Sequence, residues 1–135
     1  MSKAPHYALR ALVLLLLLQQ GCGMAKPSET DELKTFGLLY HNTQQVYQKP
    51  PTEWKQLFKL VDTPSLREDY DQLTRFKDAG YTIVWGTDAT SLAASSTILC
   101  YAPNTLKAGG PVLFANGAVV QMSAEDLANA IKNAE

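Results

Sequence analysis

The chain has 135 residues, a formal net charge of −1 and two cysteines. This length fits one domain of ordinary size, which is large enough to bury a hydrophobic core. Acidic and basic residues nearly balance and form no basic stripe, so the composition argues against nucleic acid as a partner.

The first feature along the chain is a short apolar run. It extends from Ala11 to Leu18 and follows the basic residues Lys3 and Arg10. A helix needs about twenty apolar residues to cross a bilayer, so this run is too short. A basic start, a short apolar middle and small residues after it are typical of a secretory signal. We therefore predict a signal peptide over residues 1–21.

The end of this segment, Gly21-Cys22, resembles the lipobox of bacterial lipoproteins. In that family the peptide is cut just before the cysteine, whose sulfur carries a diacylglycerol and whose new amino group is acylated. A thiol suits this chemistry because sulfur is a potent nucleophile near neutral pH. The resemblance implies cleavage between Gly21 and Cys22, lipid attachment at Cys22, and a polar tether within residues 22–30. Gln19 and Gln20 depart from the family pattern, in which Leu or Val and a small residue are usual.

A second cleavage site stays open. Gly23-Met24-Ala25 is a small-x-small triplet, after which an ordinary signal peptidase can cut. That cut removes Cys22 and leaves a soluble product that starts at Lys26. Acyl chains instead hold a protein on a membrane, because each buried CH₂ contributes about 0.8 kcal/mol.

The next part of the chain predicts three helices. The first is amphipathic, about five turns long, capped by Ser28 or Thr30 and stopped by Pro50-Pro51. Its apolar positions are Leu33, Phe36, Leu39, Tyr40, Val46 and Tyr47. Thr52 is the expected N-cap of a short second helix that carries Trp54, Leu57, Phe58, Leu60 and Val61. The third helix follows from the stripe Leu66, Tyr70, Leu73 and Phe76 and ends before Gly80.

After Gly80 the pattern changes from helix to strand. Residues 81–85 and 97–101 are rich in β-branched and aromatic side chains and predict two strands. A loop rich in Ser and Ala is expected between them, over residues 90–96. A second loop is expected over residues 103–110.

The clearest local signal is Asn116-Gly117 between two apolar runs. It predicts a hairpin with a two-residue type I′ turn, because both residues tolerate positive φ. Ser123 and Asp126 then predict the capped start of a last helix over residues 124–133. The predicted class is α+β: a long N-terminal amphipathic helix, two shorter helices, a small antiparallel sheet of about four strands, and a C-terminal helix. These elements form a single domain over residues 31–135.

The chain resembles small exported bacterial proteins with a type IV pilin-like or pseudopilin-like body, including the type II secretion G-like group. The matching stretches are Leu38 to Asn42, Pro50-Pro51 with Trp54 and Leu57, Tyr81 to Gly86, Ile98 to Tyr101, and Val112 to Val119. The resemblance implies a long helix laid on an antiparallel sheet and, for most members, no known biochemical activity. Larger members carry a His and, about ten positions later, Asp-Gly in the final hairpin. Leu106 and Asn116 stand at those places, so no role tied to them is carried over.

Several residues with reactive or bulky side chains are expected to be structural. Cys100 lies in an apolar run and fits a small core residue. Trp54 and Trp85 also lie in apolar patterns, although an exposed Trp would mark a ligand or partner surface. Glu68, Asp69 and Asp71 fan around a helix and fit a solvated face.

We name His41, Trp85, Tyr101 and Asn104 as candidate contacts for a ligand or partner. A metal site needs three or four convergent ligands, and the sequence shows no cluster with that spacing. We therefore expect no metal, no cofactor and no catalytic residue, because nothing combines a nucleophile, a base and an orienting group.

These observations predict a non-enzymatic lipoprotein of the cell envelope. It would be anchored by its N-terminal lipid on the outer side of the cytoplasmic membrane or on the outer membrane, as a structural or interaction module for envelope proteins. The alternative is a soluble or tethered binding domain for a small envelope ligand, with a pocket near residues 88–96 and 102–110. A pocket that gathers His41, Tyr101 and Asn104 would favour this alternative.

Overall fold

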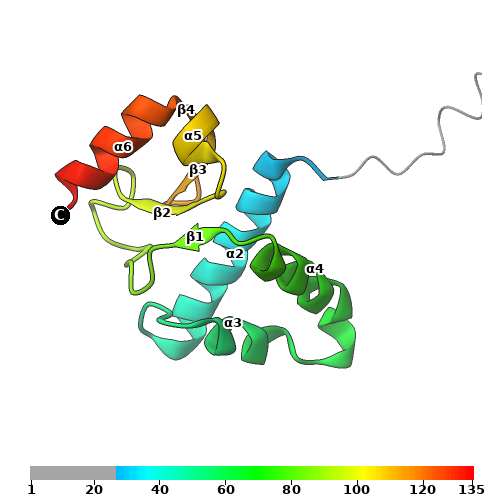
Figure 1. Cartoon of the computed structure of the whole chain (residues 1–135). Coiled ribbons are helices and arrows are strands. Elements are labelled where there is room, and N and C mark those ends of the chain that lie inside the picture. The colour runs from blue at the N-terminus through cyan, green and yellow to red at the C-terminus, as the bar shows by residue number, and fades with distance from the viewer. Residues whose placement is uncertain (1–26) are drawn as a thin grey trace, which may run out of the picture.

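The computed structural model describes residues 27–135, which form an α+β fold and confirm the predicted class. The predicted signal peptide, the Gly21-Cys22 cleavage site and the first part of the tether lie outside the described residues. In chain order the elements are α2 (Glu29–Tyr47), α3 (Trp54–Val61), the 3₁₀ turn η1 (Pro64–Leu66), α4 (Arg67–Asp78), β1 (Thr82–Ile83), β2 (Ile98–Tyr101), α5 (Thr105–Ala108), β3 (Gly110–Phe114), β4 (Val119–Met122) and α6 (Ala124–Asn133). Figure 1 shows α2 running through the middle of the molecule, with α3 and α4 at one end and the sheet and α6 at the other.

Helix α2 begins where the sequence predicts. The Ser28 side chain caps it, since its Oγ accepts a hydrogen bond from the backbone N–H of Asp31 at 3.2 Å. The helix ends at Tyr47, because Gln48 takes the left-handed conformation with φ of 58°. The chain therefore leaves the helix two residues before it reaches Pro50.

The start of α3 differs from the prediction that Thr52 is its N-cap. The N-cap is Glu53, whose side chain makes no capping hydrogen bond. Thr52 instead donates its backbone N–H to Oε1 of Gln56 at 2.7 Å. A side chain inside the helix thus satisfies a backbone donor in front of it, which is the reverse of the expected arrangement.

Helix α4 packs with one side and exposes the other. Leu73 and Phe76 are buried, whereas Leu66 lies in η1 and is exposed, so the apolar stripe begins one turn later than predicted.

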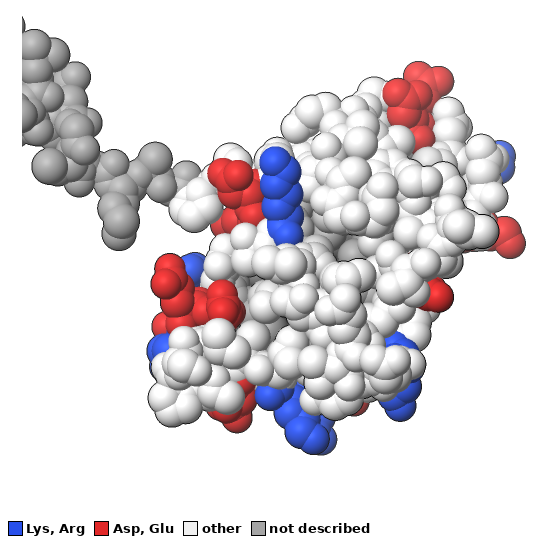
Figure 2. Space-filling model, turned by 180° about the vertical axis from the view of Figure 1, so that it is seen from behind, with Lys and Arg blue, Asp and Glu red and all other residues white. Residues whose placement is uncertain are grey.

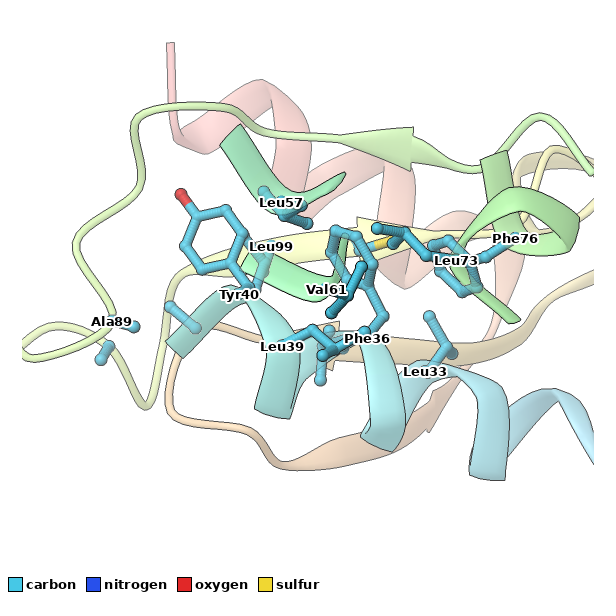
Figure 3. Close-up of a cluster of buried hydrophobic side chains, with 14 residues drawn as sticks. Leu33, Phe36, Leu39, Tyr40, Leu57, Val61, Leu73, Phe76, Ala89 and Leu99 are labelled. Carbon is cyan, nitrogen blue, oxygen red and sulfur yellow. The ribbon is translucent and has the colours of Figure 1, made fainter. Parts of the chain in front are cut away.

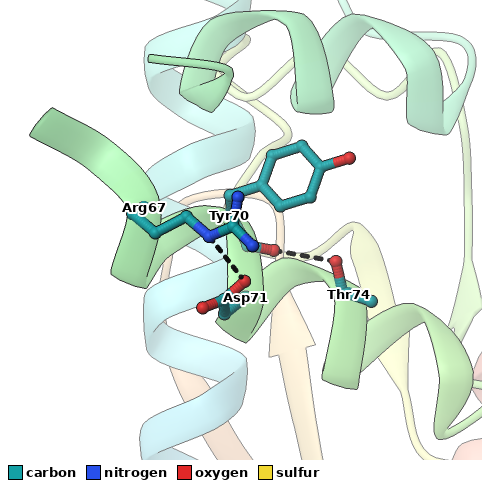
Figure 4. A network of polar contacts seen from close by, with 4 residues as sticks. All are labelled: Arg67, Tyr70, Asp71 and Thr74. Carbon is teal, nitrogen blue, oxygen red and sulfur yellow. Dashed lines mark hydrogen bonds and ion pairs between the residues drawn. The ribbon is translucent and has the colours of Figure 1, made fainter. Parts of the chain in front are cut away.

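The outer side of α4 carries a local polar network (Figure 4). Nε of Arg67 lies 3.3 Å from Oδ1 of Asp71, and Oγ1 of Thr74 donates to the carbonyl of Tyr70 at 2.9 Å. The Arg67 guanidinium also lies 5.8 Å from the centre of the Tyr70 ring. An exposed ion pair of this kind contributes at most about 1 kcal/mol, so it adds little to the stability of the fold.

The four strands form one antiparallel sheet in the order β1-β2-β3-β4. Strand β1 has only two residues instead of the predicted 81–85, although the N–H of Val84 still donates to the carbonyl of Leu99 at 2.8 Å. The register between β2 and β3 shifts between Ile98 and Cys100, which places a bulge at Leu99. Strands β3 and β4 pair without interruption.

The hairpin between β3 and β4 is confirmed, but its predicted turn type is wrong. Gly117 has a φ of 90°, whereas Asn116 has no positive φ, and a type I′ turn needs both. The N–H of Phe114 donates to the carbonyl of Ala118 at 2.8 Å, and the N–H of Gly117 donates to the carbonyl of Phe114 at 2.9 Å. These bonds are those of a three-residue loop closed by a glycine bulge.

The region 103–110, predicted as a loop, contains the single helical turn α5. The N–H of Ala108 donates to the carbonyl of Asn104, and the N–H of Gly109 donates to that of Thr105, each at 3.0 Å. Thr105, the first residue of this turn, is buried. One turn is too short for a periodic apolar pattern, so sequence reasoning missed it.

The main core lies between the first three helices and one face of the sheet (Figure 3). Aromatic rings dominate part of it: Phe36 stacks on Phe76 with centroids 4.6 Å apart, and Phe76 stacks on Tyr81 at 3.8 Å. A smaller cluster, which joins Tyr101, Val112 and Leu127, lies on the other face. Helix α2 therefore covers one face of the sheet and α6 covers part of the other.

Cys100 belongs to the main core, as predicted. It is fully buried, and this burial raises the pKa of its thiol above the usual range. A thiol held in its neutral form is a poor nucleophile, so Cys100 acts as a small apolar residue.

Candidate functional site

The predicted lipid attachment site, Cys22, lies outside the described residues. The candidate sites on the folded body lie within residues 27–135. Within that range no three His, Cys, Asp or Glu side chains are grouped so that they could hold a metal ion. None of the helices in that range is both long and apolar enough to span a bilayer.

The four predicted contact residues do not come together. His41 is half-buried on α2, whereas Tyr101 is buried with Leu127 on the opposite face of the sheet. Asn104 is exposed in front of α5, where its carbonyl accepts hydrogen bonds from the helical turn. The arrangement thus provides no single pocket that combines His41, Tyr101 and Asn104.

Trp85 is partly buried and packs against the main core. Its ring meets that of Trp54 edge-on, with centroids 5.3 Å apart, and lies 6.4 Å from that of Tyr40. Both tryptophans are partly buried and pack against the main core, as the structural interpretation expects, and part of each side chain stays exposed.

A polar cluster that the sequence did not reveal ties α2 to the turn after β1. The Gln44 side chain donates from Nε2 to Oδ1 of Asp88 at 2.6 Å, and its Oε1 accepts the N–H of Ala89 at 2.9 Å. Hydrogen bonds from Thr90 and Gln44 lower the pKa of the Asp88 carboxyl. Gln44 and Asp88 are 44 residues apart in the chain, so no local motif signals the contact.

The hydroxyl of Tyr40 belongs to the same junction. It donates to the carbonyl of Thr87 at 2.8 Å, with the carbonyl of Pro51 at 3.4 Å. Burial raises the pKa of Tyr40 to about 12. Every buried side-chain polar atom in the described part of the chain has a hydrogen-bond partner. The junction therefore stabilises the fold and leaves no buried polar side-chain atom unpaired.

One groove among the described residues, which we call the α6 groove, has a volume of about 750 Å³. Its apolar lining comes from Val84, Ile98, Tyr101 and Ile131, between the sheet and the end of α6. Of the two loops predicted to form a pocket, only Ser96 contributes to it. The groove thus lies between the strands and α6, not between the two predicted loops. Tyr101 is the one predicted contact residue that lines it.

A second groove, the hairpin groove, lies between α2 and the β3–β4 turn and has a volume of about 300 Å³. His41 lines it beside Leu38, and Asn116 lies at the hairpin side. A Cβ at Gly37 would lie only 3.1 Å from Cδ1 of Leu113, so the glycine lets α2 approach β3 closely. His41 also lies within hydrogen-bond distance of Gln45, with 3.1 Å between their side-chain nitrogens.

Lys34 also lines the hairpin groove, but beyond it the elements that form the groove carry no formal charge over long stretches. Residues 35–48 of the first helix and residues 108–124 around the hairpin contain no Asp, Glu, Lys or Arg. Leu38 and Val46 are each 61% exposed. Figure 2 shows a broad uncharged area on one side of the molecule, with charged side chains gathered around its margin. We call the outer side of α2 and the hairpin the uncharged face.

Comparisons with protein-family models, with curated proteins and with solved structures found no match to this chain. The pilin-like resemblance therefore rests on the sequence motifs alone and stays a prediction.

Proposed function

We propose that this protein is a membrane-anchored lipoprotein of the cell envelope whose pilin-like body is a non-catalytic structural or interaction module. The observation that carries the proposal for the body is the uncharged face. Leu38 and Val46 project from a helix that has no charged residue between Lys34 and Lys49. Contiguous exposed apolar surface is typical of places where another macromolecule binds, and we propose that this face is one of them.

The sequence supports the anchor. The short apolar run ends on Gly21-Cys22, the position at which bacterial lipoproteins are cut and acylated. An anchored protein moves in two dimensions, so weak contacts with neighbouring envelope proteins gain effective concentration. The anchor and the uncharged face therefore support one function together: recognition of a partner at a membrane surface.

The anchor is tested by fractionation and by the intact mass of the mature protein. We expect the wild type in the membrane fraction, with the mass of a chain that starts at Cys22 and carries acyl groups. Cys22→Ser should move the protein to the soluble fraction. The matched control is Ala25→Gln, which alters the alternative cleavage site and should leave the protein in the membrane. An unlipidated wild-type product that starts at Lys26 would overturn this part of the proposal.

The body is tested by charge substitution on the uncharged face. Leu38→Glu and Val46→Glu should reduce crosslinking of the protein to its envelope partners in intact cells. Leu66→Glu places the same charge on an exposed apolar side chain in η1, outside the uncharged face, and serves as the control. Thermal unfolding should stay unchanged in all three variants. Equal crosslinking of Leu38→Glu and wild type would argue against a partner at this face.

The α6 groove favours a second candidate function, the binding of a small apolar ligand. Its volume lies within the range of ligand pockets, and Ile98 and Ile131 line it. The neutral fluorescent probe N-phenyl-1-naphthylamine should bind wild type, and Ile131→Lys should abolish the signal. Lys132→Ala, a change outside the groove, is the control. Failure of the wild-type protein to bind the probe would exclude this candidate.

A further inference from the structure

Strand β4 is an edge strand of the sheet that has no charged residue and no proline. The strand order places it at one end, and it carries the residues Val119 to Met122. Proteins usually protect such edges with Lys, with Pro or with a bulge, because an exposed edge pairs readily with another strand. β4 contains neither a charge nor a proline, and its pairing with β3 is regular.

The ladder with β3 fixes which main-chain groups of β4 face outward. Phe114 and Ala118 share a hydrogen bond, and bonded pairs alternate with non-bonded pairs along an antiparallel ladder. Val120, opposite Val112, therefore directs its N–H and C=O toward β3. Val119 and Gln121 direct theirs toward the open edge.

We propose that β4 pairs with β4 of a second copy of this chain, antiparallel, about a two-fold axis at Val120. In this register Val119 exchanges hydrogen bonds with Gln121 of the second copy, and Gln121 does so with Val119. The Val120 residues then face each other as a non-bonded pair, with Cα atoms about 4.5 Å apart. Such an interface is self-complementary, as a two-fold axis requires.

The chemistry of the edge fits a second copy. A two-fold axis brings side chains near their own counterparts, so any charge at the centre would meet a like charge. Residues 108–124 carry none. Val120 is 46% exposed in one copy, and a cross-strand pair of β-branched residues would bury it favourably.

The pairing adds a contact between two copies at the sheet edge, separate from Leu38 and Val46, and it rests on the proposed function of an interaction module. An edge of four residues buries little area, so the association is weak in dilute solution. Confinement of both copies to one membrane supplies the concentration that such a contact needs.

Cysteine crosslinking in intact cells tests the register. Val120→Cys in the full chain should form a disulfide-linked dimer on mild oxidation, because cysteines with Cα atoms this close can be bridged. Gln121→Cys is the matched control: its counterpart lies diagonally, so it should give at least about fivefold less dimer. The wild type should give none, because Cys100 is buried and a lipidated Cys22 has no free thiol.

A second measurement avoids the new cysteine. A lysine-reactive crosslinker should capture a dimer of the wild type, and Val120→Glu should abolish it through like charges at the axis. Leu92→Glu, a change at a fully exposed loop position, should retain it.

Three results would overturn the inference: no Val120→Cys dimer from a protein with wild-type thermal unfolding, a crosslink to a chain of different mass, or equal crosslinking at positions 120 and 121. A Val120→Cys dimer from a protein without lipid would instead overturn the anchor and leave the pairing intact.

Discussion

The hydroxyl of Tyr40 donates a hydrogen bond of 2.8 Å to the backbone carbonyl of Thr87, which lies 47 residues further along the chain. This contact joins the middle of α2 to the turn that follows β1. Gly86 extends the junction, because its N–H donates to the carbonyl of Pro51 at 2.8 Å. The first helix, the double-proline segment and the sheet are thus connected at one buried point.

Removal of this hydroxyl should destabilise the protein. We expect Tyr40→Phe to lower the free energy of unfolding by about 1–2 kcal/mol, because it leaves a buried carbonyl without its partner. Urea denaturation measures the change. Tyr47→Phe is the control, since Tyr47 is partly exposed and makes no side-chain hydrogen bond among the described contacts; it should cost less than about 0.5 kcal/mol. Equal losses in both variants would contradict the role of the Thr87 contact.

The same residue predicts how stability depends on alkaline pH. Burial raises the pKa of Tyr40 from 10.0 to about 12, so the folded state favours the neutral phenol. The resulting stabilisation is present below pH 10 and is lost as the pH rises through about 12. The free energy of unfolding, measured by urea denaturation between pH 8 and pH 11.5, should fall more steeply in wild type than in Tyr40→Phe. Parallel curves would show that Tyr40 titrates as it does in the unfolded chain.

A charge at Gln44 should disrupt the neighbouring contact. Gln44→Glu replaces the donor to Asp88 with a carboxylate and should lower stability by about 1–3 kcal/mol at pH 7. The loss should shrink at pH 4, because a protonated Glu no longer repels Asp88. Gln45→Glu, the same change at an exposed neighbour, should stay within about 0.5 kcal/mol of wild type. A pH-independent loss would mean that packing, and not charge, decides the effect.

The close approach of α2 to β3 should make Gly37 intolerant of larger side chains. Gly37→Val should cost about 1–3 kcal/mol, since even a Cβ would lie 3.1 Å from Leu113. Gly37→Val should cost less in a Leu113→Ala background than in the wild type, because the shorter side chain leaves room for the valine. A double-mutant cycle from urea denaturation measures the coupling. Strict additivity would show that the clash is relieved elsewhere.

Cys100 should be inert in the folded protein. In a Cys22→Ser background, a thiol reagent at pH 8 should label Cys100 only after denaturant is added, because the thiol is buried and its pKa is raised. The rate of labelling against denaturant concentration provides the measurement. Rapid labelling of the native protein would mean that the β2 region opens readily.

Local signals in the sequence predicted the fold well. Ser28 and Ser123 accept the backbone hydrogen bonds that cap α2 and α6, and each cap depends on residues within three positions of one another. The position of the hairpin follows from Asn116-Gly117 in the same way. Its turn type does not, because Asn-Gly is compatible with both a two-residue turn and a three-residue loop with a glycine bulge.

Features that depend on distant contacts were missed. The predicted strand 81–85 is cut short because Trp85 packs on Trp54 and Gly86 bonds to Pro51, contacts made across the fold. The same limit applies to the candidate site. His41 and Tyr101 are residue types that often bind ligands. The sheet lies between them, however, and this follows only from the topology.

If Cys22 carries the proposed lipid, the cap at Ser28 limits how far the folded body can stand from a bilayer. Only residues 23–27 separate Cys22 from that cap. A chain extends by at most about 3.6 Å per residue, so this tether spans at most about 20 Å. With a lipidated Cys22, Glu29 and Asp31 would therefore be held near the headgroups. Anionic headgroups would repel these carboxylates and attract Lys26 just before them, so charge at the start of α2 would influence how the domain sits at the bilayer.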